Sequence, residues 1–165
     1  MSLLAPAIMW LQHTPLSTTI RESDWVFPSI ECVHVIAFVI VVGSIAVVDL
    51  RLVGFASRDR RIDELTSELL PITWIAFAVA AAAGLLLFIA KPLTYTQNFF
   101  FLGKMLLLAA AGANMLVFHR FVEPAVTGQT AGARPPFAAR ASGLVSLALW
   151  IATVAFGRWI GFTTN

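Results

Sequence analysis

The sequence predicts an all-α fold, a four-transmembrane-helix bundle preceded by a short interfacial helix, and three observations support it. Of the 165 residues, 59% are hydrophobic and 12% are charged, about half the charged fraction of a soluble domain. The apolar residues gather in four stretches, about 29–50, 70–90, 100–121 and 142–162. Each stretch can cross a hydrocarbon layer of about 30 Å as a helix that rises about 1.5 Å per residue.

Helices are required in these stretches, because lipid offers no partners to the backbone polar groups. The chain length predicts one membrane domain, residues 1–165, with an N-terminal segment at 1–27. The apolar run 3–11 contains Trp10 and is too short to cross, so we expect it to lie on the membrane surface. It lacks a basic leading region and a cleavage site, so we expect it to be retained. The only cysteine, Cys32, excludes an internal disulfide.

The distribution of arginine predicts the orientation in the membrane. The connection between the first two spans and the connection between the last two carry Arg51, Arg58, Arg60, Arg61, Arg120, Arg134 and Arg140. The middle connection has Lys91 and little else. The positive-inside rule therefore predicts that both termini lie outside. The net charge of +2 gives no sign of a nucleic-acid surface, so the expected partner is the lipid bilayer, and a homodimer or a larger membrane complex stays open.

Ionisable residues inside the spans are costly to bury and mark candidate functional sites. The separation of His34 from Asp49 equals that of Lys104 from His119, fifteen residues in each case (34 to 49 and 104 to 119). A weak repeat, GSIAVVDLR at 43–51 and GANMLVFHR at 112–120, suggests that spans one and three run in the same direction. Two polar layers result. The outer layer is Glu31, His34, Lys104 and Arg158, and the inner layer is Asp49, Arg51 and His119, with Arg120 beside it.

Each layer has a structural and a functional interpretation. In the outer layer, Glu31 can pair with Lys104 or Arg158 and fix the helix register. Alternatively, its excess positive charge can hold a carboxylate, a quinone carbonyl or a haem propionate. The inner layer lies where headgroups begin, so its long side chains can reach water. The structural interpretation of this layer therefore requires no ligand.

Histidine is a common ligand of haem iron, which makes His34 and His119 candidate metal ligands. Their predicted depths differ by about 22 Å at about 1.5 Å per residue, so one haem cannot use both. His13 of the N-terminal segment could instead reach His34. A Glu-x-x-His pair occurs once, at Glu31 and His34, which is a poor metal site by itself. Walker A, Gly-x-Ser-x-Gly and His-Glu-x-x-His motifs are absent from the sequence.

Several segments together resemble an uncharacterised family of small bacterial four-span inner-membrane proteins, known as a domain of unknown function. They are SIECVHVIAFVIVVGSIAVVDLRLVG at 29–54, KMLLL at 104–108, FHR at 118–120, GRWIGF at 157–162 and the W-L-x-x-T-P-L-S opening at 10–17. The resemblance implies a multi-pass location in the bacterial inner (plasma) membrane and no known activity. The family's polar positions correspond to Glu31, His34, Asp49, Arg51, Lys104, His119 and Arg158, whereas His13 is outside the pattern. More loosely, the chain is similar in architecture to four-helix membrane cytochromes b and copper-resistance membrane proteins.

Three functions fit these residues. The first is a redox or electron-transfer component that binds haem b or a quinone at the outer layer, with His34 as ligand or proton acceptor and Lys104 and Arg158 neutralising an anionic group. The second is a small-solute transporter or binding protein in which the two layers are gates. The third is a non-catalytic accessory subunit of a larger membrane complex, whose layers only hold register. Whether the chain is an enzyme stays open.

Overall fold

A computed structural model describes residues 5–56, 59–130 and 132–163, and these residues contain helices and no strand. The predicted all-α fold is confirmed. The helices are α1 (Ala5–Gln12), α2 (Pro15–Glu22), α3 (Val26–Val53), α4 (Ile62–Ala90), α5 (Pro92–Gln97), α6 (Phe99–Val117), the π-helix η1 (Phe118–Val122), α7 (Glu123–Val126) and α8 (Phe137–Thr163). Arg58, which contributes to the predicted orientation, and residues 3–4 of the predicted interfacial helix lie outside the described residues.

Four helical segments are long and apolar enough to cross a membrane: Val26–Val53, Ile62–Ala90, Phe99–Val126 and Phe137–Thr163. Large apolar side chains are exposed along all four, among them Ile36, Ile75, Leu106 and Ile151. A surface of this kind is solvated by lipid and not by water. The chain is therefore an integral, multi-pass membrane protein.

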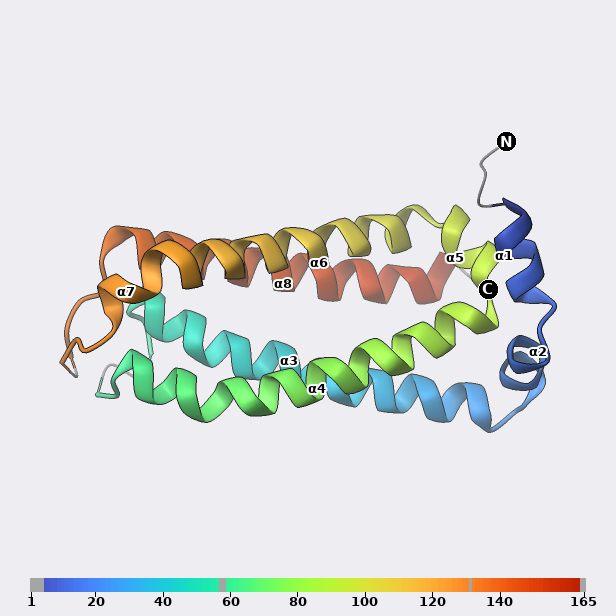
Figure 1. Ribbon diagram of the computed structural model, residues 1–165, viewed down its shortest axis with the longest axis horizontal. Helices are drawn as coiled ribbons and strands as arrows, with labels where there is room; N and C mark the ends of the chain where they lie inside the picture. Colours follow the sequence, from blue (N-terminus) through green and yellow to red (C-terminus); the bar gives the residue numbers. More distant parts are fainter. Residues whose placement is uncertain (1–4, 57–58, 131, 164–165) are drawn as a thin grey trace.

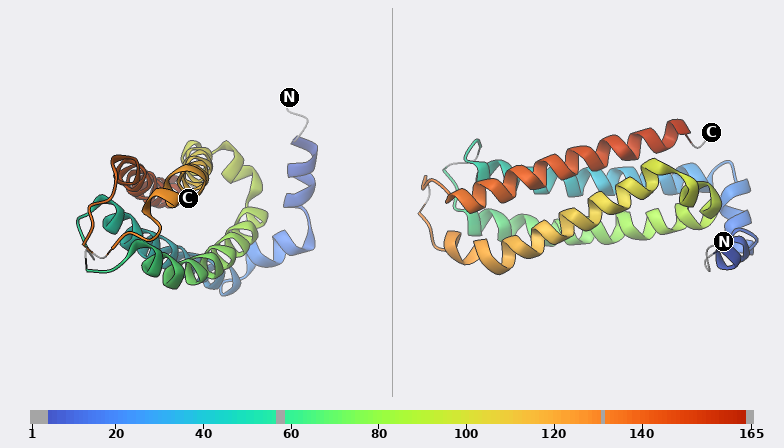
Figure 2. Two further views of the ribbon diagram at one scale, coloured as in Figure 1. Left: turned by 60° about the vertical axis from the view of Figure 1, so that its left-hand side comes forward. Right: turned by 90° about the horizontal axis from the view of Figure 1, so that it is seen from above.

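The four long helices form two antiparallel pairs. Helix α3 packs along α4 and α6 packs along α8, and contacts between α3 and α8 join the pairs. Helices α3 and α6 both start at the end that carries α5 and run in the same direction (Figure 1), as predicted. We call this the α5 end and the opposite one the Arg51 end. Helices α4 and α6 do not pack extensively against each other in the described chain, so the bundle is open along one side (Figure 2).

The N-terminal segment forms two short helices rather than the one expected. Helix α1 covers most of the predicted run, and the polar residues after it are also helical. Thr14 accepts a hydrogen bond from the Ser17 N–H and Pro15 occupies the first turn, which together start α2. The fully buried Ser17 hydroxyl donates to the Ala90 carbonyl. This hydrogen bond holds α2 against the last residue of α4, at the α5 end.

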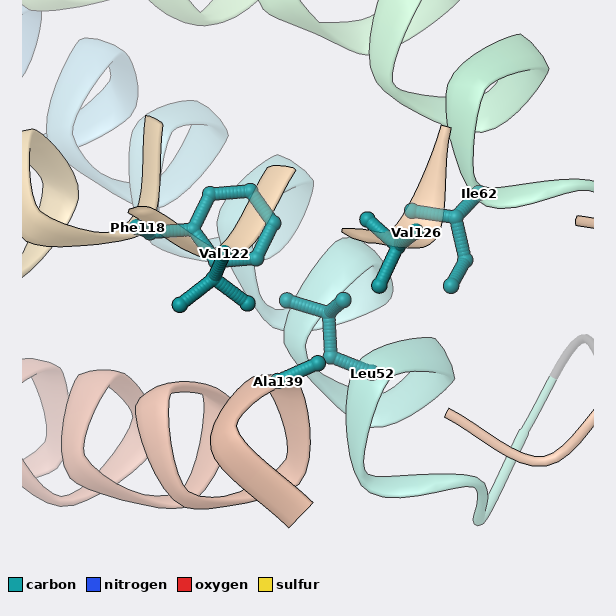
Figure 3. Packing of buried hydrophobic residues seen from close by; sticks show 6 residues of the cluster. All are labelled: Leu52, Ile62, Phe118, Val122, Val126 and Ala139. Atoms are coloured by element: carbon teal, nitrogen blue, oxygen red, sulfur yellow. The ribbon is translucent and has the colours of Figure 1, made fainter. Parts of the chain in front are cut away.

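Local signals set the ends of the long helices. Gly54 ends α3 with a φ of 83°, a conformation that favours glycine. The helices extend beyond the predicted apolar stretches. Helix α4 already begins at Ile62, and α6 continues through η1 into α7. A cluster of Leu52, Ile62, Phe118, Val122, Val126 and Ala139 packs these extensions together at the Arg51 end (Figure 3).

Asn98 starts α6, because its side-chain oxygen accepts from the N–H groups of Phe100 at 2.9 Å and Phe101 at 3.1 Å. Loss of an N-cap costs about 1 kcal/mol. We therefore expect Asn98→Ala to lower the free energy of unfolding by about 1 kcal/mol, measured by thermal melting in detergent. Asn98→Ser, which restores a capping oxygen, should recover most of the loss. Equal destabilisation by both substitutions would contradict this assignment.

Candidate functional site

Two members of the outer layer, His34 and Lys104, meet around one aromatic ring. The His34 ring stacks on Phe38 with a centroid separation of 6.1 Å, and the Lys104 Nζ lies 4.9 Å from the centroid of Phe38. Nδ1 of His34 is 2.8 Å from the Ala80 carbonyl oxygen. A Cβ on Gly84 would lie 3.0 Å from the imidazole, so this glycine leaves room for the ring against α4. The predicted common depth of His34 and Lys104 agrees with these contacts.

The other two members, Glu31 and Arg158, are exposed. The Arg158 guanidinium lies 4.6 Å from the ring centroid of Phe162. In the described chain, neither side chain forms an ion pair within 4.0 Å. The structure thus brings together His34 and Lys104 but does not close the outer layer into a four-residue pocket. A role for these residues in binding stays a prediction.

A cleft of about 220 Å³ lies between α4 and α6, with α3 and α8 as its floor. Its lining is mostly apolar, and the aromatic residues Trp74, Phe77, Phe118 and Trp150 contribute to it. Polar side chains gather in the half of the cleft toward the Arg51 end: Ser44, Asp49, Thr66, Thr73, Asn114, His119, Ser142 and Ser146. We call this cavity the α4–α6 cleft. It includes Asp49 and His119 of the predicted inner layer.

Asp49 is the buried acid of the cleft and is only 5% exposed. Its Oδ2 atom is fully buried and has no hydrogen-bond partner among the described residues. Ser146 of α8 is the polar side chain next to the carboxyl group. One turn from Ser146, a Cβ on Gly143 would lie 3.0 Å from the Asp49 carbonyl oxygen. The absence of a side chain at Gly143 therefore lets α3 and α8 approach closely at the acid.

His119 and the amide of Asn114 supply further polar groups from α6 and η1. Nδ1 of His119 lies 2.8 Å from Oε2 of Glu123, one turn nearer the Arg51 end. The Asn114 Nδ2 donates to the Ser142 carbonyl at 3.2 Å, and the Ser142 hydroxyl donates to Asn114 Oδ1 at 3.3 Å. These bonds join α6 to α8 and leave the open side of the cleft between α6 and α4.

Asn114, Ser142 and Ser146 are lining residues that the sequence did not predict. Small polar residues are common in membrane helices and do not stand out as charged ones do. A signal was nevertheless present, since Ser142, Ser146 and Trp150 follow one another at steps of four and so share a helical face. Asn114 lies five residues before His119 on the same span.

Arg51 and Arg120, the remaining members of the inner layer, do not line the cleft. Arg51 is 2% exposed and lines a separate cavity at the Arg51 end. Arg120 is exposed, with its guanidinium 5.8 Å from the ring centroid of Phe121. The predicted inner layer is thus divided between two cavities and the surface.

Among the described residues, no group of three or more His, Cys, Asp or Glu side chains gathers in a way that could hold a metal ion. His119 lines the cleft whereas His34 does not. His13 is exposed in the turn between α1 and α2. Haem ligation by His34 or His119 stays a prediction.

Comparison with known proteins identifies the family. A family model described as a family of unknown function (DUF6644) matches residues 25–163. The chain belongs to this family. The match starts at α3 and covers all four spans, so it includes the α4–α6 cleft and excludes α1 and α2. No curated protein and no solved structure matches the chain. The resemblance seen in the sequence is confirmed, and the function has to be argued from the site.

Proposed function

We propose that this protein is a membrane redox component that binds a lipid-soluble quinone in the α4–α6 cleft. The observation that carries the proposal is the unpartnered Oδ2 of Asp49, a buried carboxyl oxygen at the polar end of an apolar cleft. A buried polar atom without a partner costs free energy. A protonated Asp49 carboxyl group that donates a hydrogen bond to a carbonyl oxygen of a ligand no longer bears this cost.

A quinone has the chemistry that the lining of the cleft would recognise. Its ring can pack against Trp74 and Trp150, and its oxygens can meet Ser146 and the other polar groups. The isoprenoid tail would leave through the open side between α4 and α6 into lipid. The cavity of about 220 Å³ is below the volume of most sites for whole drug-sized ligands, about 300–1,000 Å³. It thus suits a ring-sized head group better than a porphyrin.

Reduction of a quinone to a quinol consumes two electrons and two protons. Asp49 supplies a proton-carrying group inside the cleft, and the pair of His119 and Glu123 supplies a second one toward the Arg51 end. The electrons would come from a redox partner in a larger membrane complex, one of the two assemblies that the sequence leaves open. We further propose that the protein resides in the bacterial inner membrane with the Arg51 end in the cytoplasm and both termini outside.

Fluorescence tests the proposed binding directly, because two of the five tryptophans, Trp74 and Trp150, line the cleft. Titration of detergent-purified protein with decylubiquinone should give saturable quenching. The double substitution Trp74→Phe and Trp150→Phe should remove most of the saturable part. A linear, unsaturated response that is the same in both proteins would reject quinone binding in the cleft.

Asp49→Asn separates function from stability. The substitution keeps the shape of the side chain and removes an acid that lacks a full set of partners, so we expect the melting temperature to be unchanged or higher. We expect decylubiquinone affinity to fall about tenfold, because an amide N–H is a weaker donor to a quinone carbonyl oxygen than a carboxylic acid O–H. Glu31→Gln, at an exposed acid of the same helix, should leave affinity unchanged. A loss of affinity with Glu31→Gln and not with Asp49→Asn would return the site to the outer layer.

Haem b at His34 is a second candidate, favoured by one contact. Metal-binding histidines commonly donate their other ring N–H to a carbonyl, and Nδ1 of His34 lies 2.8 Å from the Ala80 oxygen. An absorption spectrum of the purified protein before and after dithionite decides this candidate. Haem bands that disappear with His34→Gln would establish it, and a featureless spectrum would exclude it.

A further inference from the structure

A second cavity, of about 310 Å³, lies at the Arg51 end beyond the α4–α6 cleft. It is formed by the end of α3, the connection before α8 and the first turn of α8. Its lining comprises Arg51, Val53, Gly54, residues 132–135 and Arg140. We call it the arginine pocket, because Arg51, Arg134 and Arg140 all contribute to it and none of its lining residues in the described chain is acidic.

Arg51 is the most deeply buried of the three arginines. The side chain is among the largest that are fully buried, and the residue is 2% exposed. Its Nε donates to the Arg60 carbonyl oxygen at 2.9 Å. No carboxylate in the described ranges lies within 4.0 Å of its nitrogens. Burial of a guanidinium without a counter-charge costs free energy. An anion bound beside Arg51 would offset this cost.

Arg140 and Arg134 add two further positively charged residues to the lining of the same cavity. Nε of Arg140 is fully buried and lacks a hydrogen-bond partner in the part of the chain that the structure describes. Arg134 is exposed and lines the same cavity. Asp49, the buried acid two residues before Arg51 on α3, has Ser146 rather than an arginine as its polar neighbour. Three arginines from two distant parts of the chain therefore line one cavity, and no acidic side chain of the described ranges lines it with them.

We propose that the arginine pocket binds a phosphate group. A guanidinium presents a planar fork of donors that matches phosphate oxygens in a bidentate manner, and several arginines together are typical of phosphate sites. The volume lies at the lower end of the range for ligand pockets, about 300–1,000 Å³, and accommodates a phosphate with an attached group. The phosphate can belong to the headgroup of an anionic lipid or to a soluble compound, because both present the same chemistry at this end of the bundle.

Two probes distinguish these sources. Protein purified in an uncharged detergent is titrated with inorganic phosphate and, separately, with dihexanoyl phosphatidylglycerol, with dihexanoyl phosphatidylcholine in parallel. Binding is followed by the rise in melting temperature, which any ligand specific for the folded state produces. Saturable stabilisation by phosphate alone assigns a soluble ligand. Stabilisation by phosphatidylglycerol, and not by phosphatidylcholine, assigns a lipid headgroup.

Arg140→Gln should lower the affinity for the probe that binds by about tenfold to a hundredfold, as expected for the loss of charge-assisted hydrogen bonds. Arg140→Lys keeps the charge but not the fork, and should retain only part of the affinity. Arg134→Gln is a second variant, and we expect it to fold normally because Arg134 is exposed. Arg120→Gln is the matched control, because Arg120 is an exposed arginine near the same end that does not line the pocket.

Two results would overturn the proposal. One is the absence of saturable stabilisation by either anionic probe. The other is an equal loss of affinity in Arg120→Gln and Arg140→Gln, which would indicate diffuse attraction to a basic surface instead of a site. Neither outcome bears on quinone binding, because decylubiquinone carries no phosphate and the α4–α6 cleft lacks all three arginines.

Discussion

Gly112→Phe should abolish saturable quenching by decylubiquinone, with an affinity loss of more than about a hundredfold. Gly112 lines the α4–α6 cleft, and a Cβ built on it meets nothing within 4 Å. A phenylalanine can therefore enter the cleft without displacing a helix, and its ring would take the volume that a quinone head group needs. Because a ligand cannot share that volume, the effect should exceed that of any single lost hydrogen bond, about tenfold to a hundredfold.

Gly43→Phe is the matched control for this blocking variant. Gly43 is the counterpart of Gly112 in the sequence repeat, and its Cβ would also meet nothing within 4 Å, but it does not line the cleft. We expect it to bind decylubiquinone with wild-type affinity. Wild-type affinity in the folded Gly112→Phe protein would place the ligand elsewhere.

The largest loss of stability should come from Gly143→Leu. A Cβ at this position would lie 3.0 Å from the Asp49 carbonyl oxygen and 3.1 Å from the Leu52 Cβ. The backbone of α3 cannot rotate away as a side-chain tip can, so a leucine must push α3 from α8. Overpacking of this kind costs about 1–3 kcal/mol and occasionally more. Thermal melting in detergent should show a corresponding drop in melting temperature.

Gly161→Leu serves as the control on the same helix, because nothing lies within 4 Å of a Cβ at Gly161. We expect its melting temperature to stay at or above the wild-type value, since leucine has the higher helix propensity. If Gly143→Leu melts like Gly161→Leu, the close approach of α3 and α8 at Asp49 is wrong.

The depth of each residue could be predicted from the sequence, whereas its direction could not. The equal spacing of His34 to Asp49 and Lys104 to His119 placed His34 and Lys104 at one level, and their contacts with Phe38 agree. Glu31 was assigned to the same layer but is exposed. The rotation of a helix that is apolar on all sides depends on which small residues permit close packing, as Gly143 does, and no periodicity reports this.

The α4–α6 cleft could not be predicted for a related reason. Its existence depends on α4 and α6 failing to pack together, which is decided by the pairing of α3 with α4 and of α6 with α8. The charged lining residues Asp49 and His119 were identified, because charge is conspicuous in a span. The hydroxyl and amide groups of Ser146 and Asn114 were not, although they complete the polar end of the cleft.

Photolabelling with an azido-quinone locates a quinone bound to the protein. Purified protein is illuminated in detergent with the label, digested, and the modified residues are located by mass spectrometry, with decylubiquinone as competitor. We expect labels that decylubiquinone displaces on cleft residues of α4 and α6, among them Trp74, Phe77 and Met115. Labels confined to the region of His34 and Lys104, or labels that decylubiquinone does not displace, would contradict it.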